Sequence, residues 1–399
     1  MRDPLENATP DVGYQTIEWD MLKPPDERVM PLTHTNQLKL SEMSVRPDRE
    51  LTEYSLVDAD GTTYTQDDLD AVPDTPDPAA LNEVLTEIAS STGKPRRVAL
   101  AHLAKMAATA PDACTAAVEP MVDLLDHSPP AVQGEALNVL TEIGKSDPEL
   151  TRAGVDPAVT LVDSSTHPLL RNEALQFLAV FATHDPTAVT AAVPDLAVLL
   201  QDESTETDTT ARILASIGGS QPDALVDVVP KLELFLETER ETAHVWILTA
   251  IGQLSKEHPN MTVEVAPTAG ELLSADEVPL RSNAAGVLAD IADEYPTEVK
   301  PWVPDAIELM EDSDKQVRYN ATSILARVAA EHPDTVRPAT EQLLAVLDDE
   351  LDNTRFNACW ALERINATSA LERLREVAAT DSDGDVRSVA QLAVDNLED

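Results

Sequence analysis

The sequence predicts an all-α solenoid: a right-handed superhelix of about eight helix pairs with a period of 37 residues. The first observation is an Arg-x-Asn-Ala motif that begins at Arg281, Arg318 and Arg355, at intervals of 318 − 281 = 37 and 355 − 318 = 37. A fixed period of this size, built from two helices, is typical of a solenoid. The second is that the chain has just 12 glycines in 399 residues, which favours helices. The third is that aromatic residues make up only 3%, so the 43% hydrophobic content is mostly small aliphatic side chains suited to helix interfaces.

The second helix of each pair follows the pattern R-x-x-A-x-x-x-L-x-x-I/V-A. A small side chain in one slot and a long one four residues later allow neighbouring helices to approach and interdigitate. A ninth, partial copy begins at Arg387. The eight full copies begin at Arg96, Gln133, Arg171, Thr207, His244, Arg281, Arg318 and Arg355, and their Leu slots hold Leu103, Leu140, Leu178, Leu214, Ile251, Leu288, Leu325 and Leu362.

The first helix of each pair carries a proline in register. Proline removes one backbone hydrogen bond, so we expect it to bend every first helix alike and to curve the stack. The prolines are Pro120, Pro157, Pro194, Pro230, Pro267 and Pro304.

Residues 1–77 lack the period and are expected to form an N-terminal arm, ahead of a solenoid over 78–399. Asp60-Gly61, between two short β-prone runs, predicts a two-residue hairpin near 53–66. Asp58 and Asp60 also fit a calcium loop loosely, but its remaining acidic positions are missing. A proline-rich linker over 72–79 follows, and Asp77 should cap a helix with Pro78 at its first position.

The helix-pair repeats over residues 78–399 resemble the HEAT repeats of adaptins, importins and bilin-lyase-like proteins. Pro304, Asp312, Val317 and Arg318 carry four features of that pattern together, and the resemblance covers about four fifths of the chain, residues 78–399. The pattern departs at Thr207 and His244, which replace the arginine, and at Glu341, which replaces the proline; a continuous Asp–Arg ladder is therefore not expected. The resemblance implies an α-solenoid that binds other macromolecules, without naming the partner.

The formal net charge is −45, with 73 acidic against 28 basic residues. Such a surface fits either an acidic partner-directed face or adaptation to a saline cytoplasm, where salt screens the repulsion. Because the acidic residues occur in every repeat, we favour salt adaptation, and a haloarchaeal source fits it. A surface that binds phosphate is disfavoured, because phosphate contacts need Lys and Arg, so no direct nucleic-acid binding is expected.

The sequence shows neither a signal peptide nor an apolar run long enough to insert into a membrane. Its two cysteines, Cys114 and Cys359, lie more than six repeats apart, so no disulfide is expected. We therefore expect a cytoplasmic protein.

No catalytic constellation, cofactor motif or metal-binding motif is evident, and we expect no enzyme. The histidines, such as His184, His258 and His332, are expected at helix C-termini. The acidic loops, such as 381–385, are expected to cap helices rather than hold cations. Asn283, Asn320 and Asn357 share one slot in three successive repeats and should hydrogen-bond across to the neighbouring repeat.

The scarce aromatic side chains mark a candidate partner-binding patch. Trp360 occupies a slot that is polar or small in other repeats, which favours an orientation into the groove. The alternatives are packing between repeats and burial beneath the C-terminal cap. Aromatic rings near arginine are the composition of a binding hot spot. The predicted partner-binding residues are Trp246, Tyr319, Arg327, Phe356, Trp360 and Arg364.

The sequence thus predicts a non-enzymatic scaffold or adaptor that binds a protein partner through the concave face of the solenoid. Three alternatives remain: an enzyme-accessory subunit like the bilin-lyase-like proteins, a nucleic-acid-associated HEAT protein, and an N-terminal arm that folds back on its own groove.

Overall fold

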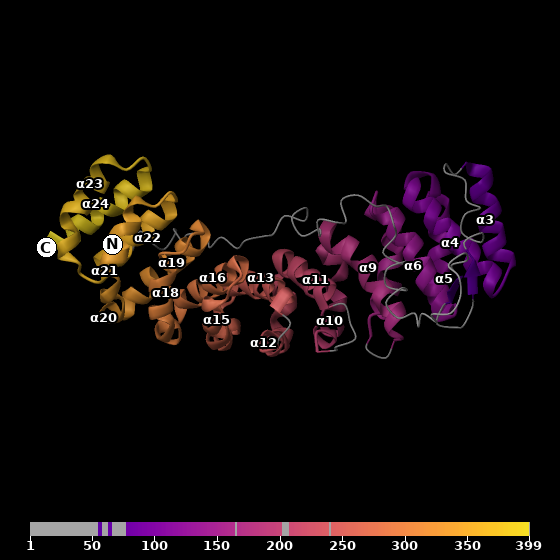
Figure 1. The fold of residues 1–399 in the computed structure, drawn as a ribbon, viewed down its shortest axis with the longest axis horizontal. Coiled ribbons are helices and arrows are strands. Elements are labelled where there is room, and N and C mark those ends of the chain that lie inside the picture. Colours follow the sequence, from indigo (N-terminus) through magenta and orange to yellow (C-terminus); the bar gives the residue numbers. More distant parts are fainter. Residues whose placement is uncertain are drawn as a thin grey trace, which may run out of the picture. The chain divides into compact units, whose positions relative to one another are not determined.

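The computed structural model describes residues 55–57, 63–65, 77–163, 166–201, 207–238 and 241–398. In these residues the chain packs as two compact units that divide between Ile213 and Leu214, inside helix α11 (Thr207–Ser220). We call them the N-terminal unit and the C-terminal unit. Both are stacks of helix pairs, which confirms the all-α solenoid (Figure 1).

The second helices form the longer row of each stack. In the C-terminal unit α16 contacts α13 on one side and α19 on the other, and α22 lies between α19 and α24 (Figure 1). In the N-terminal unit α6 lies between α4 and α9. The second helices are α4 (Lys94–Thr109), α6 (Pro130–Gly144), α9 (Pro168–His184), α11 (Thr207–Ser220), α13 (Glu241–Glu257), α16 (Val278–Glu294), α19 (Lys315–Glu331), α22 (Asp352–Arg364) and α24 (Gly384–Glu398).

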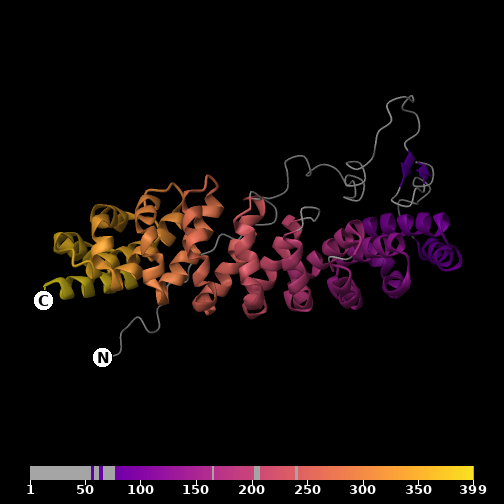
Figure 2. The ribbon, with the colours of Figure 1, turned by 90° about the horizontal axis from the view of Figure 1, so that it is seen from below.

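Most first helices are shorter, and they pack against the second helices of their unit, as α5 does against α6 and α18 against α19 (Figures 1 and 2). The last pair is complete in the structure, so the partial ninth copy at Arg387 is a full repeat. The first helices are α3 (Pro78–Ser90), α5 (Val118–His127), α8 (Val155–Thr160), α10 (Val193–Leu199), α12 (Val229–Leu236), α15 (Ala266–Glu271), α18 (Val303–Leu309), α21 (Thr340–Ala345) and α23 (Leu371–Thr380).

Most first helices are broken rather than bent, which corrects the expectation from the sequence. Pro304 lies in the first turn of α18, where its missing N–H has no helical partner to lose, and a separate turn precedes it. A second series of prolines, such as Pro296, begins that preceding turn. The preceding segments are η4 (Pro111–Ala117), α7 (Pro148–Thr151) with η5 (Arg152–Gly154), η6 (Pro186–Ala192), η7 (Pro222–Val228), α14 (Pro259–Thr262) with η8 (Val263–Val265), α17 (Pro296–Val299) with η10 (Lys300–Trp302), α20 (Pro333–Val336) with η11 (Arg337–Ala339), and η13 (Thr368–Ala370). Two further turns, η9 (Leu272–Ser274) and η12 (Val346–Asp348), follow α15 and α21.

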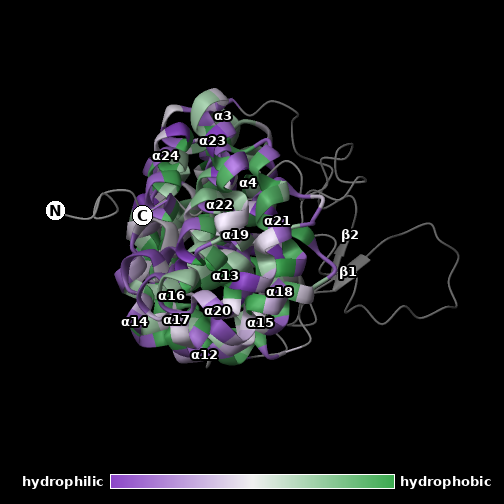
Figure 3. Ribbon diagram, turned by 90° about the vertical axis from the view of Figure 1, so that its left-hand side faces the viewer, coloured by the Kyte–Doolittle hydropathy of each residue, from purple (hydrophilic) through white to green (hydrophobic). Residues whose placement is uncertain are grey.

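The core lies where the second helices meet each other and the first helices. Every side chain in the predicted Leu slot, from Leu103 to Leu362, is fully buried, and the Ala slot is buried throughout. The predicted spacing of small and long side chains is thus confirmed. In Figure 3 individual helices carry both hydrophobic and hydrophilic positions, as expected for helices that bury one stripe and expose another.

Ahead of the helices, strand β1 (Ser55–Val57) pairs antiparallel with strand β2 (Thr63–Thr65). Val57 pairs with Thr63, so residues 58–62 separate the paired positions and the connection is longer than the predicted two-residue turn. The candidate calcium ligands Asp58 and Asp60, and most of the proline-rich linker, lie outside the described residues. As predicted, Asp77 caps α3: its Oδ1 accepts a hydrogen bond from the N–H of Ala80 at 2.7 Å.

Candidate partner-binding surface

An Asp–Arg ladder fixes the second helices of the C-terminal unit at their N-terminal ends. Arg281 donates to Asp312 at 2.8 Å, and Arg318 donates to Asp349 at 2.6 Å. Arg355 donates to Asp381 at 2.8 Å. Each aspartate lies in the turn that begins the next second helix, so each rung joins two successive repeats. Charge-assisted hydrogen bonds of this kind are the stronger ones in proteins, and these aspartates are nearly buried.

The acidic loops cap helices, as predicted. The Oδ1 atom of Asp314 accepts hydrogen bonds from the N–H groups of Gln316 and Val317 at the start of α19. Asp383 does the same for Asp385 and Val386 at the start of α24. These carboxylates satisfy N–H groups that have no partner inside the helix.

Two of the three predicted asparagines hydrogen-bond to the preceding repeat. Asn320 Nδ2 donates to the carbonyl oxygen of Ser282 at 2.8 Å, and Asn283 Nδ2 donates to Thr249 Oγ1 at 2.9 Å. Asn357 Nδ2, also buried, has no acceptor among the described residues. The asparagine slot therefore fixes repeat register at two positions, which confirms a structural role there.

Three of the six predicted partner-binding residues form a continuous stack on α22. Phe356 and Trp360 lie one turn apart with ring centroids 6.4 Å from each other in an edge-on arrangement. The Arg364 guanidinium carbon lies 5.1 Å from the centre of the Trp360 ring, in cation–π geometry. All three side chains are half-buried. We call Phe356, Trp360 and Arg364 the α22 stack.

Two polar groups of the α22 stack differ in whether they have a hydrogen-bond acceptor. Arg364 Nη1 donates to the carbonyl oxygen of Ala326 on α19 at 2.8 Å, which holds the guanidinium across the neighbouring repeat. The indole Nε1 of Trp360 is buried and has no acceptor among the described residues. A buried N–H without an acceptor costs about 1–3 kcal/mol.

The structure places Arg327 differently from the prediction. Its Nε donates to Asp293 at 3.1 Å and its Nη1 to Ser323 at 2.6 Å, and only 10% of the side chain is exposed. Arg327 therefore neutralises an aspartate of the preceding repeat. Asp293 thus occupies the guanidinium that was predicted to contact a partner.

The two remaining predicted residues do not join the stack. Tyr319 shares its repeat slot with Phe356 but is buried, at 2% exposure, so it offers no open surface. Trp246 is half-buried on α13, and two second helices, α16 and α19, separate α13 from α22. The structure therefore brings together three of the six predicted residues.

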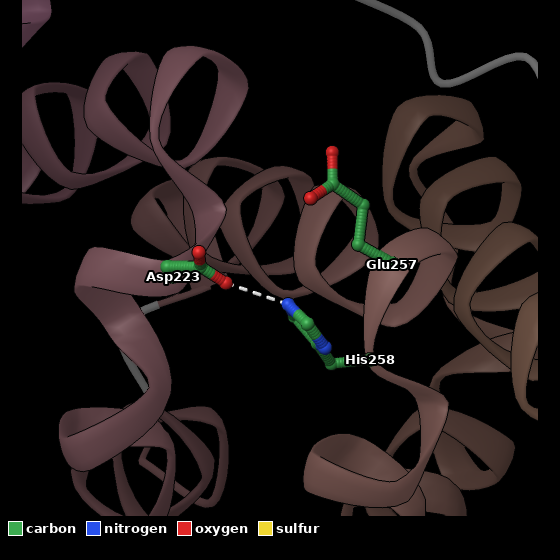
Figure 4. Close-up of side chains that lie close together, drawn as sticks. All are labelled: Asp223, Glu257 and His258. Atoms are coloured by element: carbon green, nitrogen blue, oxygen red, sulfur yellow. Dashed lines mark hydrogen bonds and ion pairs between the residues drawn. The ribbon is translucent and has the colours of Figure 1, made fainter.

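A different group of side chains converges at the other end of the second helices and was not predicted. His258 Nε2 lies 2.6 Å from Asp223 Oδ1, and Glu257 lies beside them (Figure 4). The sequence signal was present as a histidine directly before Pro259, which begins the next repeat. His258 was expected to favour a helix C-terminus; its contact with Asp223, 35 residues earlier, needs the packing of two repeats.

The cysteines are not reactive candidates. Cys114 and Cys359 are both buried and free. Burial raises the pKa of the Cys359 thiol to about 12, so it stays a protonated core side chain.

The fold and these ladders together define the class: this is an α-helical repeat protein of the solenoid type. Residues 303–395, which run from the start of α18 into α24, match the family model of HEAT repeats. Among solved structures, the crystal structure of an engineered protein aligns with a TM-score of 0.70 and 24% identity, over 82% of this chain and 92% of that chain. A structure from work on a phosphorylation switch that controls the interaction between cadherin and β-catenin aligns with a TM-score of 0.67 and 16% identity, over 80% of this chain and 72% of that chain. These similarities show the fold.

No curated protein matches the sequence significantly. Within the described residues, no helix has both the length and the apolar character needed to cross a membrane.

Proposed function

We propose that this protein is a non-enzymatic scaffold that binds a protein partner through the concave face of its solenoid, with the α22 stack as an anchor. The observation that carries the proposal is the half-buried Trp360, clamped between Phe356 and Arg364 on a second helix. Tryptophan and arginine are enriched among the few residues that dominate binding energy at interfaces.

The chemistry of the α22 stack suits a peptide segment. Trp360 is half-buried, so part of its aromatic ring remains accessible for apolar contact with a partner. Arg364 is already oriented by its hydrogen bond to Ala326, so a partner would immobilise little additional side-chain freedom. A pre-ordered aromatic–arginine pair therefore costs less entropy on binding than a flexible one.

Comparison with solved structures supports the class of function only by analogy. The structural neighbour from the cadherin and β-catenin work concerns an interaction between two proteins. A shared solenoid fold at low identity transfers no partner, so the partner of this chain has to be identified directly.

The acidic surface is the second part of the proposal. We infer that the net charge of −45 adapts the protein to a saline cytoplasm, rather than marking one acidic docking patch. The ladder supports this, because Arg281, Arg318 and Arg355 are each engaged by an aspartate of the neighbouring repeat. Phosphate binding would need accessible basic side chains, so nucleic acid is the disfavoured partner.

The test is affinity purification of the full chain in molar KCl, with captured proteins identified by mass spectrometry. Direct binding is then measured by calorimetry with the purified candidate. The proposal predicts saturable binding at a fixed stoichiometry. Binding that is lost entirely in molar KCl, or that is seen only with nucleic acid, would contradict it.

A further inference from the structure

The cluster of Asp223, Glu257 and His258 combines two carboxylates with one imidazole. Asp223 lies in η7, Glu257 is the last residue of α13, and His258 directly precedes α14. One donor atom from each side chain lies within 4.8 Å of the other two (Figure 4). Among the residues that the structure describes, these three are the set of potential metal ligands whose donor atoms lie this close together.

Other repeats make the same link between repeats without these ligands. His332 Nε2 lies 2.9 Å from Thr297 Oγ1, and Ser146 Oγ donates to Asp112 at 3.2 Å. A hydroxyl is therefore enough to join successive repeats at this edge. The fold does not require a histidine flanked by two carboxylates, so the set at 223–258 needs a separate explanation.

Electrostatics point to a cation. The Glu257 carboxylate takes part in no hydrogen bond or ion pair among the described residues, and it lies beside the Asp223 carboxylate in a chain with a net charge of −45. Two carboxylates held close together repel each other unless a positive charge lies between them. A bound divalent ion would provide that charge.

The donor set selects the class of ion. Imidazole nitrogen with carboxylate oxygens is a ligand set used for zinc and related transition-metal ions, at bond lengths of roughly 2.0–2.2 Å. Donor atoms around such an ion are about 3.3 Å apart in tetrahedral geometry. Ion binding would replace the 2.6 Å hydrogen bond between His258 Nε2 and Asp223 Oδ1 by two metal bonds, so these two atoms would move apart to about 3.3 Å while the exposed Glu257 side chain rotates toward the ion.

We propose that Asp223, Glu257 and His258 bind a divalent transition-metal ion of the zinc class. Asp223 lies in η7, the turn that precedes the α12–α13 pair, and His258 begins the next pair. A bound ion would therefore link two successive repeats of the C-terminal unit. Three protein ligands leave one position for water. Binding to the folded state alone raises the stability of that state.

The experiment is a titration of the full, chelator-treated chain with CoCl2 in molar KCl and excess MgCl2. The magnesium and the salt suppress general cation binding to acidic side chains. Visible absorption reports tetrahedral cobalt, and calorimetry with ZnCl2 gives stoichiometry and affinity. We expect one equivalent to bind, a visible cobalt spectrum, and a higher melting temperature with zinc.

Matched variants separate the ion from the link between repeats. Glu257→Gln leaves the contact between His258 and Asp223 intact and should weaken binding at least tenfold. His258→Ala should abolish the cobalt spectrum. His332→Ala, at the equivalent position of another repeat, should bind as the unaltered chain does. If the unaltered chain binds no more cobalt than His258→Ala, or if Glu257→Gln and His332→Ala bind equally, the site is not a metal site.

Discussion

Arg355 donates two parallel hydrogen bonds to the carboxylate of Asp381, from Nε to Oδ2 and from Nη2 to Oδ1, both 2.8 Å long. The same guanidinium donates from Nη1 to the carbonyl oxygen of Asp349, in the turn of its own repeat, at 2.9 Å. One arginine thus ties two successive turns. Arg318 repeats the arrangement one period earlier, with Asp349 as its carboxylate and Asp312 as its carbonyl partner.

The Asp381 rung makes stability depend on pH. The hydrogen bond from Arg355 holds the pKa of Asp381 below its ordinary value. A lowered pKa in the folded state stabilises the protein fully above the unfolded pKa, about 3.9 for aspartate. That contribution is lost as pH falls from about 4 through the folded pKa.

We therefore expect Asp381→Asn to lower the free energy of unfolding at pH 7 by about 2–3 kcal/mol, because it leaves a nearly buried arginine without its charge partner. The difference from the unaltered chain should shrink as pH falls below about 4. Urea unfolding across that pH range measures both effects. The control is Asp334→Asn, whose exposed pair with Arg337 should change stability by less than about 1 kcal/mol. Equal losses in the two variants would show that the rung has no special role.

Gly270 allows a tight contact between repeats. A Cβ atom at this position would lie 2.1 Å from the indole ring of Trp302. Gly270→Ala should destabilise the protein by about 1–3 kcal/mol, as overpacking does. Gly219, exposed in α11 with nothing near its missing Cβ, is the control, and Gly219→Ala should stabilise by up to about 1 kcal/mol. Thermal unfolding measures the change in stability of each variant. Stabilisation by both substitutions would refute the close contact between Gly270 and Trp302.

The period marks the structural unit. Deletion of residues 281–317 removes 317 − 281 + 1 = 37 residues and joins Leu280 to Arg318, so the start of α16 continues into α19. Each repeat contacts chiefly its neighbours, so the shortened chain should fold with the same helicity per residue. Deletion of 281–298, about half a period, should not. Circular dichroism compares the two, and similar damage from both deletions would contradict a modular stack.

Salt should stabilise the protein. The charge of −45 is spread through the repeats, and the Debye length falls from about 10 Å at 0.1 M salt to about 3 Å at 1 M. We expect the melting temperature to rise as KCl increases from millimolar to molar. A flat or falling melting temperature would rule out the salt-adaptation proposal.

The period made the core predictable, because burial at a repeated slot follows from helix geometry. Leu325 and Leu362 are buried for the same reason, and the sequence shows that reason. Exposure at other slots was not predictable. Tyr319 and Phe356 share a slot, yet Tyr319 is buried and Phe356 is half-buried, since exposure depends on what surrounds each repeat.

Contacts between repeats were also not predictable from the sequence. Arg327 was expected to pair with a partner, but it reaches Asp293, 34 residues earlier in the chain. The broken first helices also escaped prediction, because a proline in register is compatible with either a bend or a new helix start. α21 begins at Thr340 although Glu341 replaces the proline, so the break does not depend on a proline at that slot.

The measurement that tests the proposed function most directly is the affinity of the purified partner for two double variants of the full chain. Trp360→Ala with Arg364→Ala removes the anchor, and Leu234→Ala with Arg337→Ala removes one exposed apolar and one exposed basic side chain elsewhere. Anchors of this kind each contribute about 2 kcal/mol or more to binding. We expect the first variant to bind at least tenfold more weakly with a nearly unchanged melting temperature, and the second to bind normally. If the first variant instead unfolds several degrees earlier and its folded fraction binds normally, the α22 stack is packing and the proposed binding surface is wrong.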